Sequence, residues 1–148
     1  MNRRRAIAVL SLLGALDGAY LLLGKLGVIG GLECSISRGC DMVNASVYSE
    51  FLGLPVAGIG LAGYLAIFVV ALVGQQSSRV GERWPDQLLA LLSGVAVLFT
   101  LYLTYAELFI LRAICQWCVV SQIVIVAIFV LALLGLKREA NIEHPTSK

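Results

Sequence analysis

Four cysteines in this 148-residue chain fall into two close pairs, a spacing that suits thiol–disulfide chemistry. Cys34 and Cys40 lie in a glycine-rich stretch, whereas Cys115 and Cys118 form a Cys-Gln-Trp-Cys motif. Residues three apart share a helix face, so the second pair can bond internally with both sulfurs on one side. A helix N-terminus would also stabilise its thiolate and make its disulfide easy to reduce. The pattern predicts a relay in which a mobile dithiol exchanges with a fixed one.

The residues alone leave two other uses of the cysteines open. One is a structural zinc site, but such sites usually have two close-spaced pairs, which the five residues between Cys34 and Cys40 fit poorly. The other is a pair of inert structural disulfides, although a bond between Cys115 and Cys118 within a first helical turn would be a poor staple. We therefore favour redox chemistry and expect no metal.

Apolar runs must position these cysteines. The mean hydropathy is +0.92 and only 14% of residues are charged, whereas soluble domains carry about 25%. Each run is near the roughly 20 residues that a helix needs to cross the hydrocarbon core, where helices satisfy their own backbone. The sequence thus predicts an all-α fold, with residues 1–148 forming a single integral membrane domain, a four-helix transmembrane bundle. The predicted spans cover about residues 6–24, 55–74, 87–110 and 114–136.

Basic residues near the run ends predict the orientation in the membrane. One side holds Arg3, Arg4, Arg5, Arg79, Arg83, Lys137, Arg138 and Lys148. The other side holds Lys25, Arg38 and Arg112. We expect both termini to be cytoplasmic, and the loop 25–54 and the turn 111–113 to be exoplasmic. All four cysteines then lie on or near the face where disulfides persist. The net charge of only +2 gives no indication of nucleic-acid binding.

The outer loop is predicted to contain a short amphipathic helix at the membrane surface, spanning Asp41–Leu54. Asp41 is its expected N-cap, and Gly53 and Pro55 are expected to end it. Its apolar residues recur at helical spacing, at Val43, Val47, Phe51 and Leu54.

A few residues inside the apolar runs admit more than one interpretation. Asp17 lies in mid-run, where an interior pairing role and proton handling are equally open. Glu107 is likewise a functional candidate as an acid in an apolar run, but it lies near the outer end of that run, and we favour the interpretation that it simply reaches water. Trp117 lies between the two cysteines, where it would either tune the site or be an ordinary interfacial aromatic, and we favour the second interpretation. Three glycines allow either close helix packing or space for a flat ring, namely Gly58, Gly60 and Gly63.

Several stretches resemble the bacterial homologues of vitamin K epoxide reductase. They are the sequence from Cys34 to Ser46, the segment Gly53-Leu-Pro-Val-Ala with Tyr64 beyond it, and Ala113-Ile-Cys-Gln-Trp-Cys-Val-Val-Ser. The resemblance covers roughly residues 6–136. Its specific features are a loop pair first, a CxxC motif on the last helix, and a serine six residues after the second loop cysteine.

The resemblance implies a role for each cysteine. Cys34 would exchange with a soluble partner, Cys40 would attack or pair with Cys115, and Cys118 would lie nearest a membrane quinone. Ser46 would help to hold the quinone or the loop helix.

Spacing along the last helix extends the predicted quinone site. Gln122 and Ile125 follow Cys118 at i+4 and i+7, so we expect this face to offer one polar group and then an apolar wall. The vertebrate enzyme has a tyrosine where Gln122 stands, which favours plain quinone reduction over vitamin K epoxide.

We therefore expect a thiol:quinone oxidoreductase of the bacterial inner membrane that supports disulfide bond formation. Many bacterial relatives carry a fused thioredoxin-like domain, whereas this chain ends soon after its fourth helix. The expected partner is thus a separate thioredoxin-like or DsbA-like exoplasmic protein. Two alternatives are a vitamin K epoxide reductase proper and a non-enzymatic four-helix membrane protein with structural disulfides. A DsbB-like oxidase would carry the two cysteine pairs in the opposite order.

Overall fold

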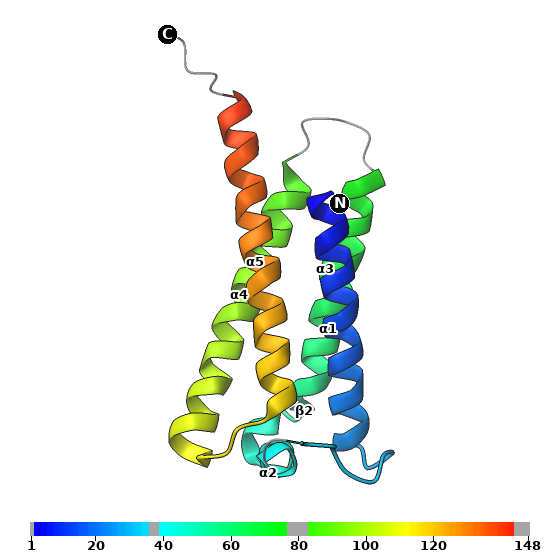
Figure 1. Ribbon diagram of the computed structural model, residues 1–148, viewed down its shortest axis with the longest axis vertical. Coiled ribbons are helices and arrows are strands. Elements are labelled where there is room, and N and C mark those ends of the chain that lie inside the picture. The colour runs from blue at the N-terminus through cyan, green and yellow to red at the C-terminus, as the bar shows by residue number, and fades with distance from the viewer. Residues whose placement is uncertain (1, 36–38, 77–82, 144–148) are drawn as a thin grey trace.

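Long helices dominate the computed structural model, which describes residues 2–35, 39–76 and 83–143. Within those ranges, four helices are long and apolar enough to cross a membrane, which confirms the predicted all-α bundle. They are α1 (Arg3–Lys25), α3 (Val56–Gln76), α4 (Trp84–Tyr105), which the π-helix η2 (Ala106–Leu111) extends, and α5 (Gln116–Glu143). Figure 1 shows them side by side along the long axis.

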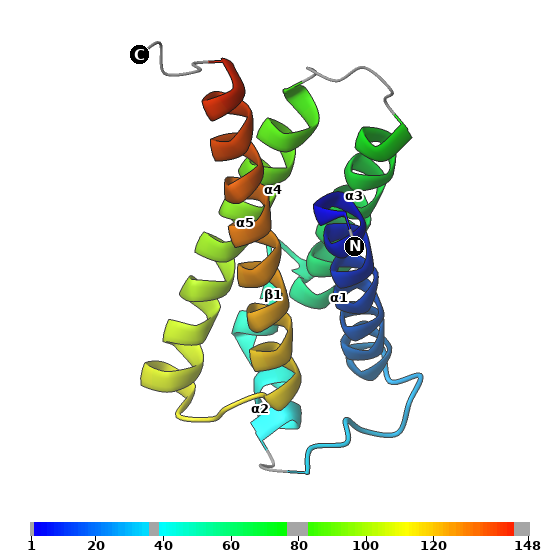
Figure 2. The same ribbon diagram turned by 45° about the horizontal axis from the view of Figure 1, so that its top comes forward.

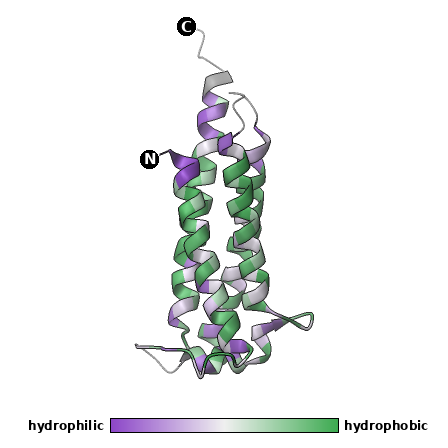
Figure 3. Cartoon of the chain, turned by 90° about the vertical axis from the view of Figure 1, so that its right-hand side faces the viewer, coloured by the Kyte–Doolittle hydropathy of each residue, from purple (hydrophilic) through white to green (hydrophobic). Residues whose placement is uncertain are grey.

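The helices bury a narrow core and leave large apolar side chains outside it. Helix α1 packs against α3 and α5, and α4 packs against α5. Ile67 and Ile128 are fully buried, whereas Leu98 is 70% exposed and Leu16 61% exposed. Figure 3 shows a hydrophobic band along the helices with hydrophilic residues at both ends. Apolar surface of this extent is suited to lipid rather than water.

A charged cluster ties the helices together at the end that holds both termini. The carboxylate of Asp86, at the start of α4, is fully buried and lies 2.9 Å from guanidinium nitrogens of Arg3 and Arg4. Arg4 also donates a hydrogen bond to the carbonyl oxygen of Gly74 at the end of α3. Two cations and one buried anion therefore fix the ends of α1, α3 and α4 against one another.

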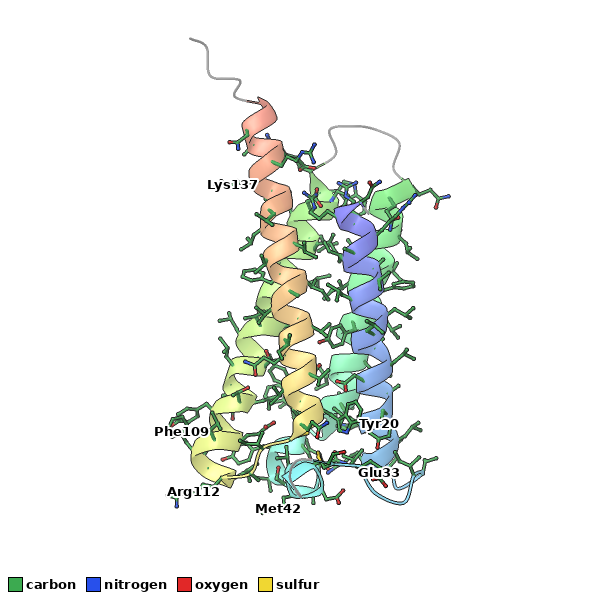
Figure 4. The ribbon with its side chains drawn as sticks, in the orientation of Figure 1. Tyr20, Glu33, Met42, Phe109, Arg112 and Lys137 are labelled. Atoms are coloured by element: carbon green, nitrogen blue, oxygen red, sulfur yellow. A yellow bond between two sulfur atoms is a disulfide. The ribbon has the colours of Figure 1, made fainter. Side chains whose placement is uncertain are left out.

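The cysteine-bearing segments lie at the opposite end of the bundle. Figures 1 and 2 place α2 there, below the ends of the long helices. In Figure 4, Lys137 marks the end with the termini and Arg112 marks the cysteine end. This arrangement supports the predicted division of basic residues, of which Arg38, Arg79 and Lys148 lie outside the described residues.

The loop after α1 contains the expected short helix, but its extent was predicted wrongly. Helix α2 covers only Gly39–Ala45, a 3₁₀ turn η1 follows at Val47–Ser49, and a small antiparallel hairpin pairs β1 (Glu50–Phe51) with β2 (Leu54–Pro55). The hairpin requires positive φ at both turn residues, and Leu52 and Gly53 have φ of 54° and 79°. Gly53 therefore reverses the chain instead of ending a helix.

Local side-chain hydrogen bonds explain why α2 is short. The Ser46 hydroxyl donates to the carbonyl oxygen of Val43, and the Ser49 hydroxyl donates to the carbonyl oxygen of Ser46, both at 2.7 Å. Such bonds compete with the backbone hydrogen bonds that would continue the helix. Asp41 is also not the N-cap, because α2 begins two residues earlier, and its carboxylate instead accepts a hydrogen bond from the Leu32 N–H at 3.3 Å.

Candidate redox site

The two cysteine pairs meet where α5 begins. Cys34 and Cys40 form a disulfide with their Cα atoms 6.2 Å apart, whereas Cys115 and Cys118 are free thiols. Cys40 is 0% exposed and Cys115 is 1% exposed, and both belong to one buried cluster around Leu32. The fold thus brings together all four cysteines that the sequence singled out, and it buries one member of each pair against the other pair.

Contacts from α1 and α5 hold the loop in this position. The indole N–H of Trp117 donates to the carbonyl oxygen of Glu33 at 2.9 Å, and the Glu33 N–H donates to the Tyr20 hydroxyl at 3.0 Å. The rings of Tyr20 and Trp117 are 5.1 Å apart. Figure 4 shows Tyr20 and Glu33 together at this end of the bundle. Trp117 is therefore more than an interfacial aromatic, because it fixes the backbone directly before Cys34.

Cys115 occupies the N-cap position of α5. Its carbonyl oxygen accepts from the Val119 N–H at 3.1 Å, and its sulfur accepts from the Cys118 N–H at 3.3 Å. The sulfur thus takes the place of the oxygen in a usual N-cap residue. The hydrogen bond with the Cys118 thiol lowers the pKa of the Cys115 thiol, which burial and the nearby Glu107 oppose. This geometry favours a thiolate on Cys115.

Glu107 is buried beside this motif, so the expectation that it reaches water was wrong. Its side chain is only 6% exposed, and Oε2 accepts a hydrogen bond from the Cys115 N–H at 3.3 Å. The carboxyl group is also hydrogen-bonded to the Cys118 side chain. The reason is the chain reversal at Arg112, whose left-handed φ of 48° folds the start of α5 back over η2. An acid in an apolar run, eight residues before a CxxC motif, was the available signal.

A cavity of about 620 Å³ opens between the long helices and reaches the CxxC sulfurs. Its volume lies within the range typical of small-molecule sites, and its wall is mostly apolar. A Cβ added at Gly60 or Gly63 would meet no atom within 4 Å. These two glycines border the cavity, which favours the interpretation that they leave space for a ring. The polar groups on the wall include Tyr64, Thr100, Glu107 and Ser121.

Ser46 and Gln122 lie outside the lining of this cavity. The Ser46 hydroxyl is directed to its own loop backbone, and Gln122 Oε1 accepts from the Thr104 hydroxyl at 2.6 Å. The residues of α5 that follow Cys118 on the cavity wall are Ser121 and Ile125. Helical spacing allows either i+3 or i+4 to share the face of Cys118, and the packing of α5 selects i+3.

A second polar group lies deeper in the bundle. The Tyr64 hydroxyl donates to the carbonyl oxygen of Ser121 at 2.7 Å and lies 2.9 Å from the Ser121 hydroxyl oxygen. Asp17 is 9% exposed and close enough to interact electrostatically with Tyr64. Both expectations for Asp17, interior pairing and proton handling, stay open.

Four membrane-type helices, a disulfide docked against a CxxC motif and a cavity at its sulfurs define a class of protein, the membrane-embedded thiol–disulfide oxidoreductases. Residues 5–133 match the Vitamin K epoxide reductase family, and the chain belongs to this family. Enzymes of the family are quinone-linked thiol–disulfide oxidoreductases, so this protein is such an enzyme. Among the described residues, no His, Cys, Asp and Glu side chains are grouped as metal ligands.

Proposed function

We propose that this enzyme reoxidises a thioredoxin-like or DsbA-like exoplasmic protein and passes the electrons to a quinone, in support of disulfide bond formation. The observation that carries the proposal is the order of the sulfurs. Cys34 is half-buried in the loop, Cys40 and Cys115 are buried in one cluster, and both of these line the cavity together with the half-buried Cys118. Electrons that enter at Cys34 therefore have a continuous path to the cavity.

The exposure of the loop cysteines supports Cys34 as the entry point. A partner thiolate attacks the Cys34 sulfur, a bond to the partner forms, and Cys40 leaves as a thiolate. Cys40 then attacks Cys115 of an oxidised Cys115–Cys118 pair, and Cys118 is released. The second partner thiol displaces Cys34 and completes the partner's disulfide. Cys34 attacks Cys40, which restores the loop disulfide and leaves Cys115 and Cys118 as the free thiols present in the structure.

The cavity fits the quinone that closes this cycle. Its apolar wall suits an isoprenoid tail, and polar groups on the wall, among them Glu107 beside Cys118, would meet the ring oxygens. A bound quinone accepts two electrons and two protons. Tyr64 and Ser121 would orient the ring from below Cys118, and Gly60 with Gly63 would leave room for its face. Ser46 and Gln122 stay in the proposal as residues that act on the quinone site indirectly. Ser46 would act through the loop, and Gln122 would act through Thr104, which lines the cavity.

The cellular setting is part of the same proposal. The basic residues at the end with the termini support cytoplasmic termini and exoplasmic cysteines in a bacterial inner membrane. We also propose that residues 1–148 act as a single integral membrane domain.

Trapping the relay intermediate tests the proposed electron path. Cys118→Ala should accumulate a disulfide between Cys40 and Cys115, because Cys118 is no longer present to re-form the CxxC bond. Mass spectrometry of the peptides from the variant should find this pair, and the matched Cys115→Ala variant should lack it. A Cys34–Cys115 peptide instead would reverse the roles of the loop cysteines. Absence of quinone-dependent oxidation of a dithiol partner by the wild type would contradict the proposed path from partner to quinone.

A further inference from the structure

We infer that Glu107 is a catalytic acid and base of this enzyme, which gives a proton to the Cys118 sulfur when that thiol is released and removes it when the CxxC disulfide re-forms. The inference deepens the proposed function and rests on it, since it concerns the two steps at Cys118. It assigns a residue outside the four cysteines to the chemistry.

The position of Glu107 requires an explanation beyond packing. Burying a carboxyl group in an apolar region costs several kcal/mol unless it is paired or neutralised. Among the described residues, the salt bridges of this protein do not include Glu107, and its hydrogen-bond partners are the Cys115 N–H and the Cys118 side chain. Both partners belong to the CxxC motif. The carboxyl group is therefore placed for that motif rather than for an opposite charge.

A hydrogen bond also holds the backbone of Glu107. Its carbonyl oxygen accepts a hydrogen bond from the Ala113 N–H at 3.1 Å, across the left-handed turn at Arg112. The residue lies in the π-helical end of the third span, a geometry common at functional sites. The same turn that reverses the chain thus aims the carboxyl group at the start of α5.

The cavity supplies the reason why a proton carrier is needed. A free thiolate on the half-buried Cys118 would be costly beside this mostly apolar cavity. Cys118, Cys115 and Glu107 all line the cavity. When Cys40 attacks the sulfur of Cys115, the S–S bond to Cys118 breaks and the Cys118 sulfur takes the proton of Glu107. The negative charge of the attacking thiolate then rests on the Glu107 carboxylate, which accepts a hydrogen bond from the Cys115 N–H, rather than on the departing sulfur.

The return step balances in the same way. The Cys115 and Cys118 thiols lose two protons and one electron pair as their S–S bond forms. The electron pair goes to the quinone of the proposed function, and two O–H bonds form on its oxygens. Glu107 accepts the proton of Cys118 and returns it toward a ring oxygen, and the proton of Cys115 is the second one. This last transfer leaves Glu107 as a carboxylate. Of the two protons that the partner's thiols lose, one goes to Cys115 and the other reprotonates Glu107, so the residue ends the cycle in the state in which it began.

Replacing Glu107 by glutamine removes the proton-carrying group while keeping the size and shape of the side chain. The Gln side chain keeps an oxygen to accept from the Cys115 N–H but cannot carry a proton between sulfur and quinone. General acid–base catalysis contributes roughly 10²–10⁴-fold, so kcat for quinone reduction should fall by about 100-fold or more. The KM for quinone and the midpoint of thermal unfolding should stay near the wild-type values. Glu107→Asp should recover part of the rate, and Glu50→Gln, a change at an exposed acid of the hairpin, should have none of these effects.

A second measurement needs no quinone and keeps the inference distinct from the proposed function. The assay measures exchange from the reduced loop pair to an oxidised Cys115–Cys118 pair in protein that lacks quinone, by quenching and peptide mapping. Glu107→Gln should slow this exchange. A wild type that exchanges normally but never reduces quinone would count against the proposed acceptor and leave the role of Glu107 intact. Wild-type rates in both assays for Glu107→Gln would overturn the inference. An equal loss of exchange, stability and quinone affinity would overturn it too, because that pattern indicates a structural role.

Discussion

At the scale of single residues, the chemistry depends on an asymmetry between the two CxxC sulfurs. Both sulfurs line the cavity. Cys115 caps the helix, accepts hydrogen bonds from Cys118 and is buried with Cys40, whereas Cys118 is hydrogen-bonded to Glu107. One sulfur is thus stabilised as a thiolate at the surface-facing end. The other is held near a proton carrier. This difference agrees with the proposed roles, in which Cys115 exchanges with the loop and Cys118 is the sulfur that Glu107 protonates.

The pH dependence of Cys115 follows from this asymmetry. Because the hydrogen bond with Cys118 lowers the pKa of Cys115, the thiolate persists to lower pH than for an ordinary thiol. Cys118→Ala removes this bond, so the thiolate of Cys115 should appear only at higher pH. The measurement is a titration of thiolate ultraviolet absorbance in protein that also carries Cys34→Ala and Cys40→Ala. Cys118→Ser, which keeps a hydroxyl donor, is the matched control and should shift the midpoint less. An unchanged midpoint in both variants would show that the helix N-terminus alone sets this pKa.

At the scale of elements, the relay depends on how closely α2 approaches the start of α5. A Cβ added at Gly39 would overlap the carbonyl oxygen of Ile114. Only glycine therefore lets α2 lie against the backbone that precedes Cys115. The residue directly after it is Cys40, so this contact brings the loop sulfur into the buried cluster.

Gly39→Ala should disrupt transfer between the cysteine pairs while leaving the pairs themselves intact. Forcing a methyl group into a packed contact typically costs about 1–3 kcal/mol, so exchange from Cys40 to Cys115 should slow roughly tenfold or more. Rapid mixing with a reduced dithiol, followed by acid quenching and peptide mapping, measures this rate. Gly30→Ala is the control in the same loop, because a Cβ there meets no atom within 4 Å. Equal rates in the two variants would mean that the α2 contact does not limit the relay.

At the scale of the whole molecule, the bundle separates a charged end from a redox end. The Asp86 cluster ties α1, α3 and α4 together near the termini, and the cysteines lie at the far end of the same helices. Such a layout lets a rigid body present one face to each side of a membrane. The chemistry then takes place only on the face that carries the loop.

Labelling of intact cells tests the proposed orientation. With both termini cytoplasmic, Cys34 should react with a membrane-impermeant thiol reagent after mild reduction, because it is the more exposed of the loop cysteines. A cysteine placed at Arg5, which is exposed at the other end, should react only after the membrane is opened. The opposite pattern would invert the topology and place the redox chemistry on the cytoplasmic side.

The amino-acid sequence by itself determined the class of fold and the kind of chemistry. Apolar runs of spanning length, the distribution of basic residues and the order of the two cysteine pairs are local properties of the chain. They suffice to predict a helical membrane bundle with its cysteines at one end, and a resemblance in the motifs around Cys34 and Cys115 indicated the family. None of these inferences needs to know how one helix is rotated against another.

The tertiary structure alone decided which side chains surround the sulfurs. By helical spacing alone, Ser121 and Gln122 are equally able to share the helix face of Cys118. Only the packing of α5 against its neighbours turns Ser121 toward the cavity. The burial of Glu107 likewise depends on a left-handed turn at a non-glycine residue, which no local preference predicts. Contacts between distant segments compensate for such local costs, and they are visible only when the whole chain is folded.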